Sequence, residues 1–111
     1  MSDANTGISP PTRDEVFDAL RPIADPEIRI SIVELGLIYD VEPQNDGRDI
    51  TVKMTLTSPM CPVGPMIMTA VHETVALMPG VDNVDVQLVW DPPWDPRLMA
   101  SDEAKDQLGI W

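Results

Sequence analysis

Residues Thr55–Pro65, with the sequence TLTSPMCPVGP, join two different patterns and decide how the chain is organised. An alternating strand pattern runs into this stretch, and an apolar helical pattern runs out of it. It holds the only cysteine, Cys61, and three prolines that stiffen the turn. Proline fixes φ at about −65° and biases the residue before it toward extended backbone. We therefore predict a helix that begins at Pro65, with Gly64 as its N-cap.

The predicted helix start bears on the chemistry of Cys61. The free N–H groups and the positive dipole end of a helix lower the pKa of a nearby thiol and favour the thiolate. A lone cysteine is also a small apolar side chain that packs well in a core. The local sequence leaves both interpretations of Cys61 open.

The composition describes one small acidic domain. The chain has 111 residues, of which 43% are hydrophobic, and its formal charge is −12. Such a surface repels phosphate backbones and anionic lipids, so we expect neither nucleic acid nor a membrane as a partner. The N-terminal residues lack the basic start and apolar core of a secretory signal. One cysteine cannot form an internal disulfide, and we expect a cytoplasmic protein.

The domain is expected to begin at residue 12. Residues 1–11 are small and polar and end in two prolines, so we expect a flexible tail that folding does not require. Residues 12–111 then form a single domain. Thr12 and Glu15 fit a capping box at the start of a helix, which should end before Pro22.

Strand and helix signals alternate through the middle of the chain. Alternation predicts three strands, over residues 37–42, 50–56 and 84–90, with Leu37, Tyr39 and Val41 on one face of the first. A turn at residues 43–48 joins the first two into a hairpin. The helix before the third strand makes a crossover, which implies a parallel pair. The order α-β-β-α-β predicts an α+β fold, a small two-layer sandwich with a mixed three-stranded sheet.

The C-terminal segment is predicted to be a short helical tail. Residues 90–99 contain three prolines and cannot form a central strand. Asp95 and Ser101 are each placed to cap a short helix. Trp90 and Trp94 form either a lid on the core or, with Trp111, a surface for a partner.

The residues limit the chemistry available to Cys61. If His72 lies about two turns along the helix after Pro65, it is too far from Cys61 for a nucleophile–base pair. Structural zinc and iron–sulfur sites need about four ligands. A metal at Cys61 must therefore be transient and shared, between two chains or with a partner or small thiol. Asp25 and Glu27 either supply hard ligands or tune the thiolate, or they simply cap the turn at Pro26.

Four motifs carry a resemblance to a known family. In order and spacing they closely resemble the small domain of SufT-type iron–sulfur assembly proteins, which also occurs in PaaD-type maturation proteins and eukaryotic cytosolic iron–sulfur targeting factors. The resemblance covers roughly residues 12–111. PaaD-type proteins carry extra C-terminal cysteine pairs that this sequence lacks, which favours the SufT-like branch. The motifs are Asp25–Glu27, Ile32–Val41, Met54–Pro62 and Val89–Trp94.

The resemblance implies an accessory or targeting role in iron–sulfur cluster assembly and in the maturation of iron–sulfur proteins. It implies a reactive Cys61 with Asp25 as its acidic partner, and it places Thr57 and Ser58 in the signature loop. We expect Ser58 and Glu27 to contact a transient cluster, and no cofactor to be bound tightly. The expected partners are iron–sulfur assembly proteins, client apoproteins and, if two chains share a metal, a second copy in a homodimer.

Two other functions compete with this one. The first is a thiol-dependent enzyme in which Asp25 and Thr57 assist Cys61. The second is a pure protein-interaction module whose cysteine is structural. An enzyme is the less favoured of the readings, because no general base lies within reach of the thiol along the helix.

Overall fold

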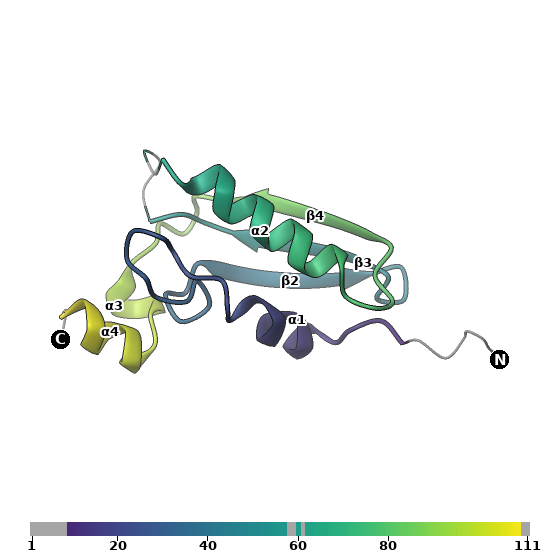
Figure 1. Ribbon diagram of the computed structural model, residues 1–111, viewed down its shortest axis with the longest axis horizontal. Helices are drawn as coiled ribbons and strands as arrows, with labels where there is room; N and C mark the ends of the chain where they lie inside the picture. The colour runs from purple at the N-terminus through teal and green to yellow at the C-terminus, as the bar shows by residue number, and fades with distance from the viewer. Residues whose placement is uncertain (1–8, 58–59, 61, 110–111) are drawn as a thin grey trace.

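The computed structural model describes residues 9–57, 60 and 62–109 of the chain. Its elements follow the predicted order α-β-β-α-β and end in two short helices (Figure 1). Helix α2 runs along the sheet, α1 lies beside β2, and the C-terminal helices lie at the opposite end from the turn between β2 and β3. The elements are α1 (Arg13–Leu20), β2 (Ile38–Gln44), β3 (Asp49–Met54), α2 (Gly64–Ala76), β4 (Asn83–Leu88), α3 (Pro96–Met99) and α4 (Asp102–Leu108).

The capping box predicted for α1 is present. The Thr12 side chain accepts a hydrogen bond from the backbone N–H of Glu15 at 3.1 Å. The Glu15 carboxylate accepts one from the N–H of Thr12 at 2.8 Å. Two of the N–H groups at the helix start are thereby satisfied. The helix ends at Leu20, before Pro22, as predicted.

The sheet is mixed and three-stranded, in the order β2-β3-β4. Strand β2 pairs with β3 antiparallel, and β3 pairs with β4 parallel, which confirms the predicted crossover. Alternate residues of β3 face the helices and form the centre of the core. Buried apolar side chains of the helices and sheet meet there: Val16, Leu20, Val41, Ile50, Val52, Met54, Ile67, Val71 and Val75.

A bulge in β2 changes the predicted alternation of that strand. The pairing passes from Ile38 opposite Met54 to Asp40 opposite Lys53, so the register shifts between Ile38 and Asp40. Ile38 and Val41 are consequently both buried, whereas alternation placed them on opposite faces. The extra residue, Tyr39, is turned toward the C-terminal segment. Bulges commonly redirect a side chain in this way.

Several predicted boundaries were wrong by one or two residues, and strands β3 and β4 end at Met54 and Leu88, two residues earlier than predicted. The first strand continues through Pro43 and Gln44, where a turn was predicted, because an edge strand tolerates a proline. Helix α2 begins at Gly64, with Val63 rather than Gly64 as the N-cap. A side chain on Gly64 would meet the Leu56 methyl group at 2.5 Å, so the helix starts in close contact with the end of the preceding strand.

The segment before β2 forms a loop with one helical turn. The N–H of Leu35 donates to the carbonyl of Ser31 at 2.9 Å, and the Ser31 hydroxyl accepts from the N–H of Val33 at 3.2 Å. An isolated bridge joins Ala24 to Ser31. The buried side chains of Ile32 and Leu35 anchor this loop in the core.

Contacts extend from the domain to residues before Thr12. Pro11 is buried, and Pro10 lies against the turns that contain Gly47 and Gly80. Residues 9–11 therefore pack on the domain, although the sequence assigned them to a tail. Residues 1–8 lie outside the described part of the chain, and the flexible tail stays a prediction for them. Among the described helices, none is long and apolar enough to cross a membrane.

Gly36 is predicted to be the glycine whose replacement is most damaging. Its φ is +79°, and a Cβ there would lie 2.4 Å from the Met99 carbonyl oxygen. Gly36→Ala should lower the free energy of unfolding by about 2–4 kcal/mol, from left-handed strain and displacement of the C-terminal segment.

The matched control is Gly109→Ala, where φ is +70° but no atom lies within 4 Å of the added Cβ. Gly109→Ala should lower the free energy of unfolding by only about 1 kcal/mol, from the left-handed backbone strain alone. Urea unfolding of both variants measures the difference. Equal losses would show that the contact with Met99 is unimportant.

Candidate functional site

The residues predicted from sequence fall on two loops. Asp25 and Glu27 lie in the loop after α1, and Thr57 lies just beyond the end of β3. Ser58 and Cys61 lie outside the described residues, so the site is defined by the segments that flank them.

The loop that contains the cysteine has closely spaced ends. Leu56, at its start, is buried, and Gly64, at its end, is buried against it. Because a Cβ on Gly64 would lie 2.5 Å from the Leu56 methyl group, the chain leaves β3 and enters α2 at nearly the same place. Thr57 is half-buried and Met60 is exposed. The described residues on either side of the cysteine, Leu56 and Gly64, are thus held close together at the end of the sheet.

The start of α2 presents the positive end of a helix dipole, which neither its N-cap residue nor its first turn compensates. Its N-cap, Val63, provides no side-chain hydrogen bond, and its first turn contains no acidic residue. Pro65 removes one donor, but the remaining N–H groups and the helix dipole still favour negative charge at this end. A thiolate is one such anion.

Asp25 organises the other loop. Its carboxylate is almost fully buried, with 1% of the residue exposed. Its Oδ1 atom accepts hydrogen bonds from the N–H groups of Glu27 at 2.8 Å and Ile28 at 3.2 Å. Its backbone carbonyl accepts from Arg29 at 2.6 Å, where φ is +64°. Asp25 therefore caps the turn at Pro26, which is one of the roles predicted for it from the sequence.

Glu27 differs from Asp25 in its exposure. Its backbone N–H is held by the Asp25 carboxylate, while the residue itself is exposed at the surface of the loop. The buried carboxylate shapes the loop, and the exposed one is free of the core and accessible from solvent.

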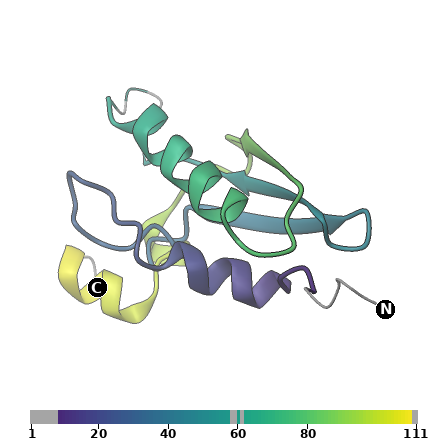
Figure 2. The same ribbon diagram turned by 45° about the vertical axis from the view of Figure 1, so that its right-hand side comes forward.

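A series of backbone hydrogen bonds links the two loops. The N–H of Thr55 donates to Leu37 at 2.8 Å, and the N–H of Leu37 donates to Ile32 at 3.0 Å. The N–H of Ile32 donates in turn to Ile23 at 2.9 Å, two residues before Asp25. Figures 1 and 2 show the loop before β2 and the start of α2 at the same end of the molecule.

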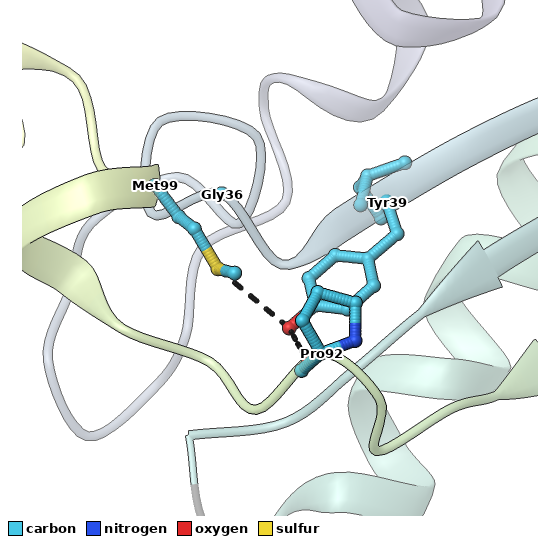
Figure 3. Close-up of a pocket in the computed structure, with 5 residues that line it drawn as sticks. Gly36, Tyr39, Pro92 and Met99 are labelled. Carbon is cyan, nitrogen blue, oxygen red and sulfur yellow. Dashed lines mark hydrogen bonds between the residues drawn. The ribbon is translucent and has the colours of Figure 1, made fainter.

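The C-terminal segment packs over this end, and the sequence reasoning did not foresee how. The Tyr39 hydroxyl donates to the Pro92 carbonyl at 2.6 Å (Figure 3). The Trp94 indole N–H donates to the Leu35 carbonyl at 2.8 Å, so Trp94 acts as the predicted lid. Trp90 is 43% exposed. Trp111 lies outside the described residues.

An open pocket of about 360 Å³ lies beside this contact. Burial raises the pKa of the Tyr39 phenol; the Thr55 hydroxyl opposes that shift, and the Asp91 charge adds to it. The phenol is therefore neutral near pH 7 and remains a donor. The Thr55 hydroxyl lies near the phenol but does not reach hydrogen-bond geometry with it, so it is fully buried without a hydrogen-bond partner in the described part of the chain. The pocket is lined by Gly36, Ile38, Tyr39, Pro92 and Met99.

No group of three or more His, Cys, Asp or Glu side chains that could hold a metal occurs among residues 9–57, 60 and 62–109. His72 lies on α2, as supposed from the sequence, and it is exposed. Any metal at this end of the molecule would need ligands from the cysteine loop or from another molecule.

Comparison with known proteins connects these loops to a family. Residues 13–87, which include both loops, match the family described as iron-sulfur cluster assembly protein. The chain is 42% identical over 98 residues to the Fe-S protein maturation auxiliary factor YitW of Bacillus subtilis, covering 88% of this chain and 94% of that protein. It is 44% identical over 88 residues to the Fe-S protein maturation auxiliary factor SufT of Staphylococcus aureus, covering 79% and 98%.

The fold is shared with a solved structure. A domain of unknown function from Bacillus anthracis superposes with a TM-score of 0.80 at 35% identity, covering 89% of this chain and 92% of that one. The α+β architecture with its mixed sheet is thus that of an existing structural group.

Asp25 is predicted to act on stability through its hydrogen bonds. Asp25→Ala leaves the N–H groups of Glu27 and Ile28 without their acceptor, which should cost about 1–3 kcal/mol of unfolding free energy. Asp25→Asn keeps a carbonyl oxygen in place and should lose less than about half as much. Thermal and urea unfolding of the two variants decide the matter. If Asn destabilises as much as Ala, the charge and not the acceptor stabilises the loop.

Proposed function

We propose that this chain, which belongs to the iron–sulfur cluster assembly protein family, is an accessory factor in the maturation of iron–sulfur proteins. The observation that carries the proposal is the match over residues 13–87, since it spans the loop of Asp25, the end of β3 and the cysteine loop together. The relatives described as Fe-S protein maturation auxiliary factors are similar over nearly their whole length.

In this proposal Cys61 is the group that acts on the cargo. Leu56 and Gly64 flank the cysteine and lie close together, so the thiol would be presented within a short reach of them. The field at the start of α2 favours the thiolate, which is the form that binds iron. The cluster is cargo, and a chain with one thiolate can supply only one of its usual four ligands. The remaining ligands would come from a second copy, a partner protein or a small thiol.

The other predicted residues have supporting parts in the same proposal. The buried Asp25 fixes the loop that carries the exposed Glu27, and Glu27 would then face a docked partner or cluster. Thr57 is half-buried at the entry to the cysteine loop, where it would position Ser58 and Cys61.

The partners in this proposal are iron–sulfur assembly proteins and client apoproteins in the cytoplasm. A homodimer is one way to bring two thiolates to a shared cluster. The strongly acidic surface, with a formal charge of −12, supports protein partners over nucleic acids or membranes.

The experiment compares variants in cells that lack the chromosomal copy of the gene. The readout is the activity of a [4Fe–4S] dehydratase, corrected for the amount of the dehydratase polypeptide. The unaltered chain should restore that activity, and Cys61→Ser should not, although it accumulates and unfolds like the unaltered chain. The matched control is His72→Ala, an exposed change on α2 that should restore activity fully.

Each competing function predicts a different result. A pure interaction module would let Cys61→Ser restore the dehydratase. A thiol-dependent enzyme would leave dehydratase activity independent of the chain and would turn over a small substrate in isolation. Either result would contradict the maturation role of Cys61.

A further inference from the structure

The outer edge of β4 is the end of the sheet in the order β2-β3-β4. The N–H of Asn83 donates to Arg48 and the N–H of Val89 donates to Met54, both toward β3. Because alternate residues of a parallel pair direct their backbone groups to opposite sides, the N–H groups of Val84, Val86 and Leu88 point away from β3. These residues can accept an added strand.

The two edges of the sheet differ in how they are protected. Strand β2 contains Pro43 and a bulge between Ile38 and Asp40, and Arg13 of α1 is paired with Asp40 at 2.8 Å. Prolines, bulges and covering elements discourage the addition of further strands. Strand β4, NVDVQL, has no proline, no lysine and no shift in its register with β3. Among the described residues, these protective features occur on β2 alone.

The side chains of β4 define what an added strand would meet. Val84, Val86 and Leu88 pair with core residues of β3 and lie on the helix-covered face, where Val84 and Val86 are half-buried and Leu88 is 37% exposed. Asp85 and Gln87 lie on the opposite face and are exposed. The edge therefore offers apolar contacts on one face and a carboxylate on the other.

The negative charge around the outer edge of β4 favours a positively charged partner. Asp82, Asp85 and Asp91 are exposed along or beside β4, and none takes part in the salt bridges between described residues that the structure shows. Arg48, whose carbonyl accepts from the N–H of Asp82, directly precedes β3. Lys53 of β3, opposite Gln87, is paired with Glu42 at 3.0 Å. A second copy would bring a further formal charge of −12 to this edge, whereas a basic segment would be attracted to it.

We propose that the outer edge of β4 binds an extended basic segment of a partner protein by strand addition. Alternate Lys or Arg residues of that segment lie on the face of Asp85, and the apolar residues between them pack beside Val86 and Leu88. Backbone hydrogen bonds give the affinity and the alternating side chains give the selectivity. The inference rests on the proposed function, because an accessory factor in maturation needs a protein partner.

The test titrates the full chain with a short blocked peptide of alternating Lys and Val, and with a Glu–Val peptide of the same length. The Lys–Val peptide should bind and slow amide hydrogen exchange at Val84, Val86 and Leu88. The binding should weaken at an ionic strength of about 1 M, where the screening length falls to about 3 Å. The Glu–Val peptide should not bind. Equal binding of both peptides, or unchanged exchange at these amides, would overturn the proposal.

The variant Val86→Pro removes an outward N–H without removing a bond to β3, and an edge strand tolerates it. It should weaken binding of the Lys–Val peptide about tenfold or more, since at least one backbone hydrogen bond is lost. The matched control, Val86→Thr, keeps the N–H and should bind like the unaltered chain. Undiminished binding by a folded Val86→Pro chain contradicts strand addition. If Val86→Pro does not fold, the amide exchange of the unaltered chain still decides.

Two further outcomes separate this proposal from others. Cys61→Ser should bind the Lys–Val peptide like the unaltered chain, so a failure of peptide binding is distinct from a failure of maturation. Dimerisation of the chain that slows exchange at Val84 and Val86 without peptide would identify a second copy as the occupant and overturn the assignment to a basic partner.

Discussion

The hydrogen bond from the N–H of Thr55 to the carbonyl of Leu37 joins the end of β3 to the loop that precedes β2. Thr55 and Leu37 are both completely buried, so neither backbone group has water as an alternative partner. Breaking the bond would leave a buried donor and a buried acceptor unpaired, which costs more than a surface hydrogen bond contributes. The relative placement of the acidic loop and the cysteine loop depends on this connection.

The C-terminal segment reinforces the same end of the molecule. Tyr39 and Trp94 donate to carbonyls across the junction, at Pro92 and Leu35, and the N–H of Ser101 donates to the carbonyl of Glu34 at 2.7 Å. Gly36 allows the Met99 backbone to approach closely. These contacts make a rigid base where β3 ends and α2 begins, and a residue that must meet cargo on another protein requires such a base.

The sequence correctly predicted several features that depend on neighbouring residues or on the order of the elements. The capping box at Thr12, the caps at Asp95 and Ser101, and the crossover between β3 and β4 are each confirmed. The bulge at Tyr39 was missed because it depends on a contact with Pro92, 53 residues away. An alternating pattern of apolar and polar residues predicts a regular strand. It cannot indicate a contact with residues far along the chain.

The sequence predicted which residues belong to the candidate site, but not how their side chains are arranged in space. The sequence singled out Asp25, but its burial and its two hydrogen bonds to the following N–H groups depend on the path of the whole loop. The sequence also gave no sign of the pocket under Pro92 and Met99, since its walls come together only when the C-terminal segment folds back over β2. Glycine at position 36, before an alternating run, was the one local indication of a close approach.

The central claim is that Cys61 handles iron–sulfur cargo as one ligand among several from different molecules. Anaerobic reconstitution with iron and sulfide, counted per chain and combined with the mass of the species in solution, tests it most directly. The account predicts that the isolated monomer retains no stable cluster, and that iron and sulfide are retained only in a complex with a second thiolate source and are lost in Cys61→Ser. A monomer that holds a stable [4Fe–4S] cluster without added thiol or partner would contradict it.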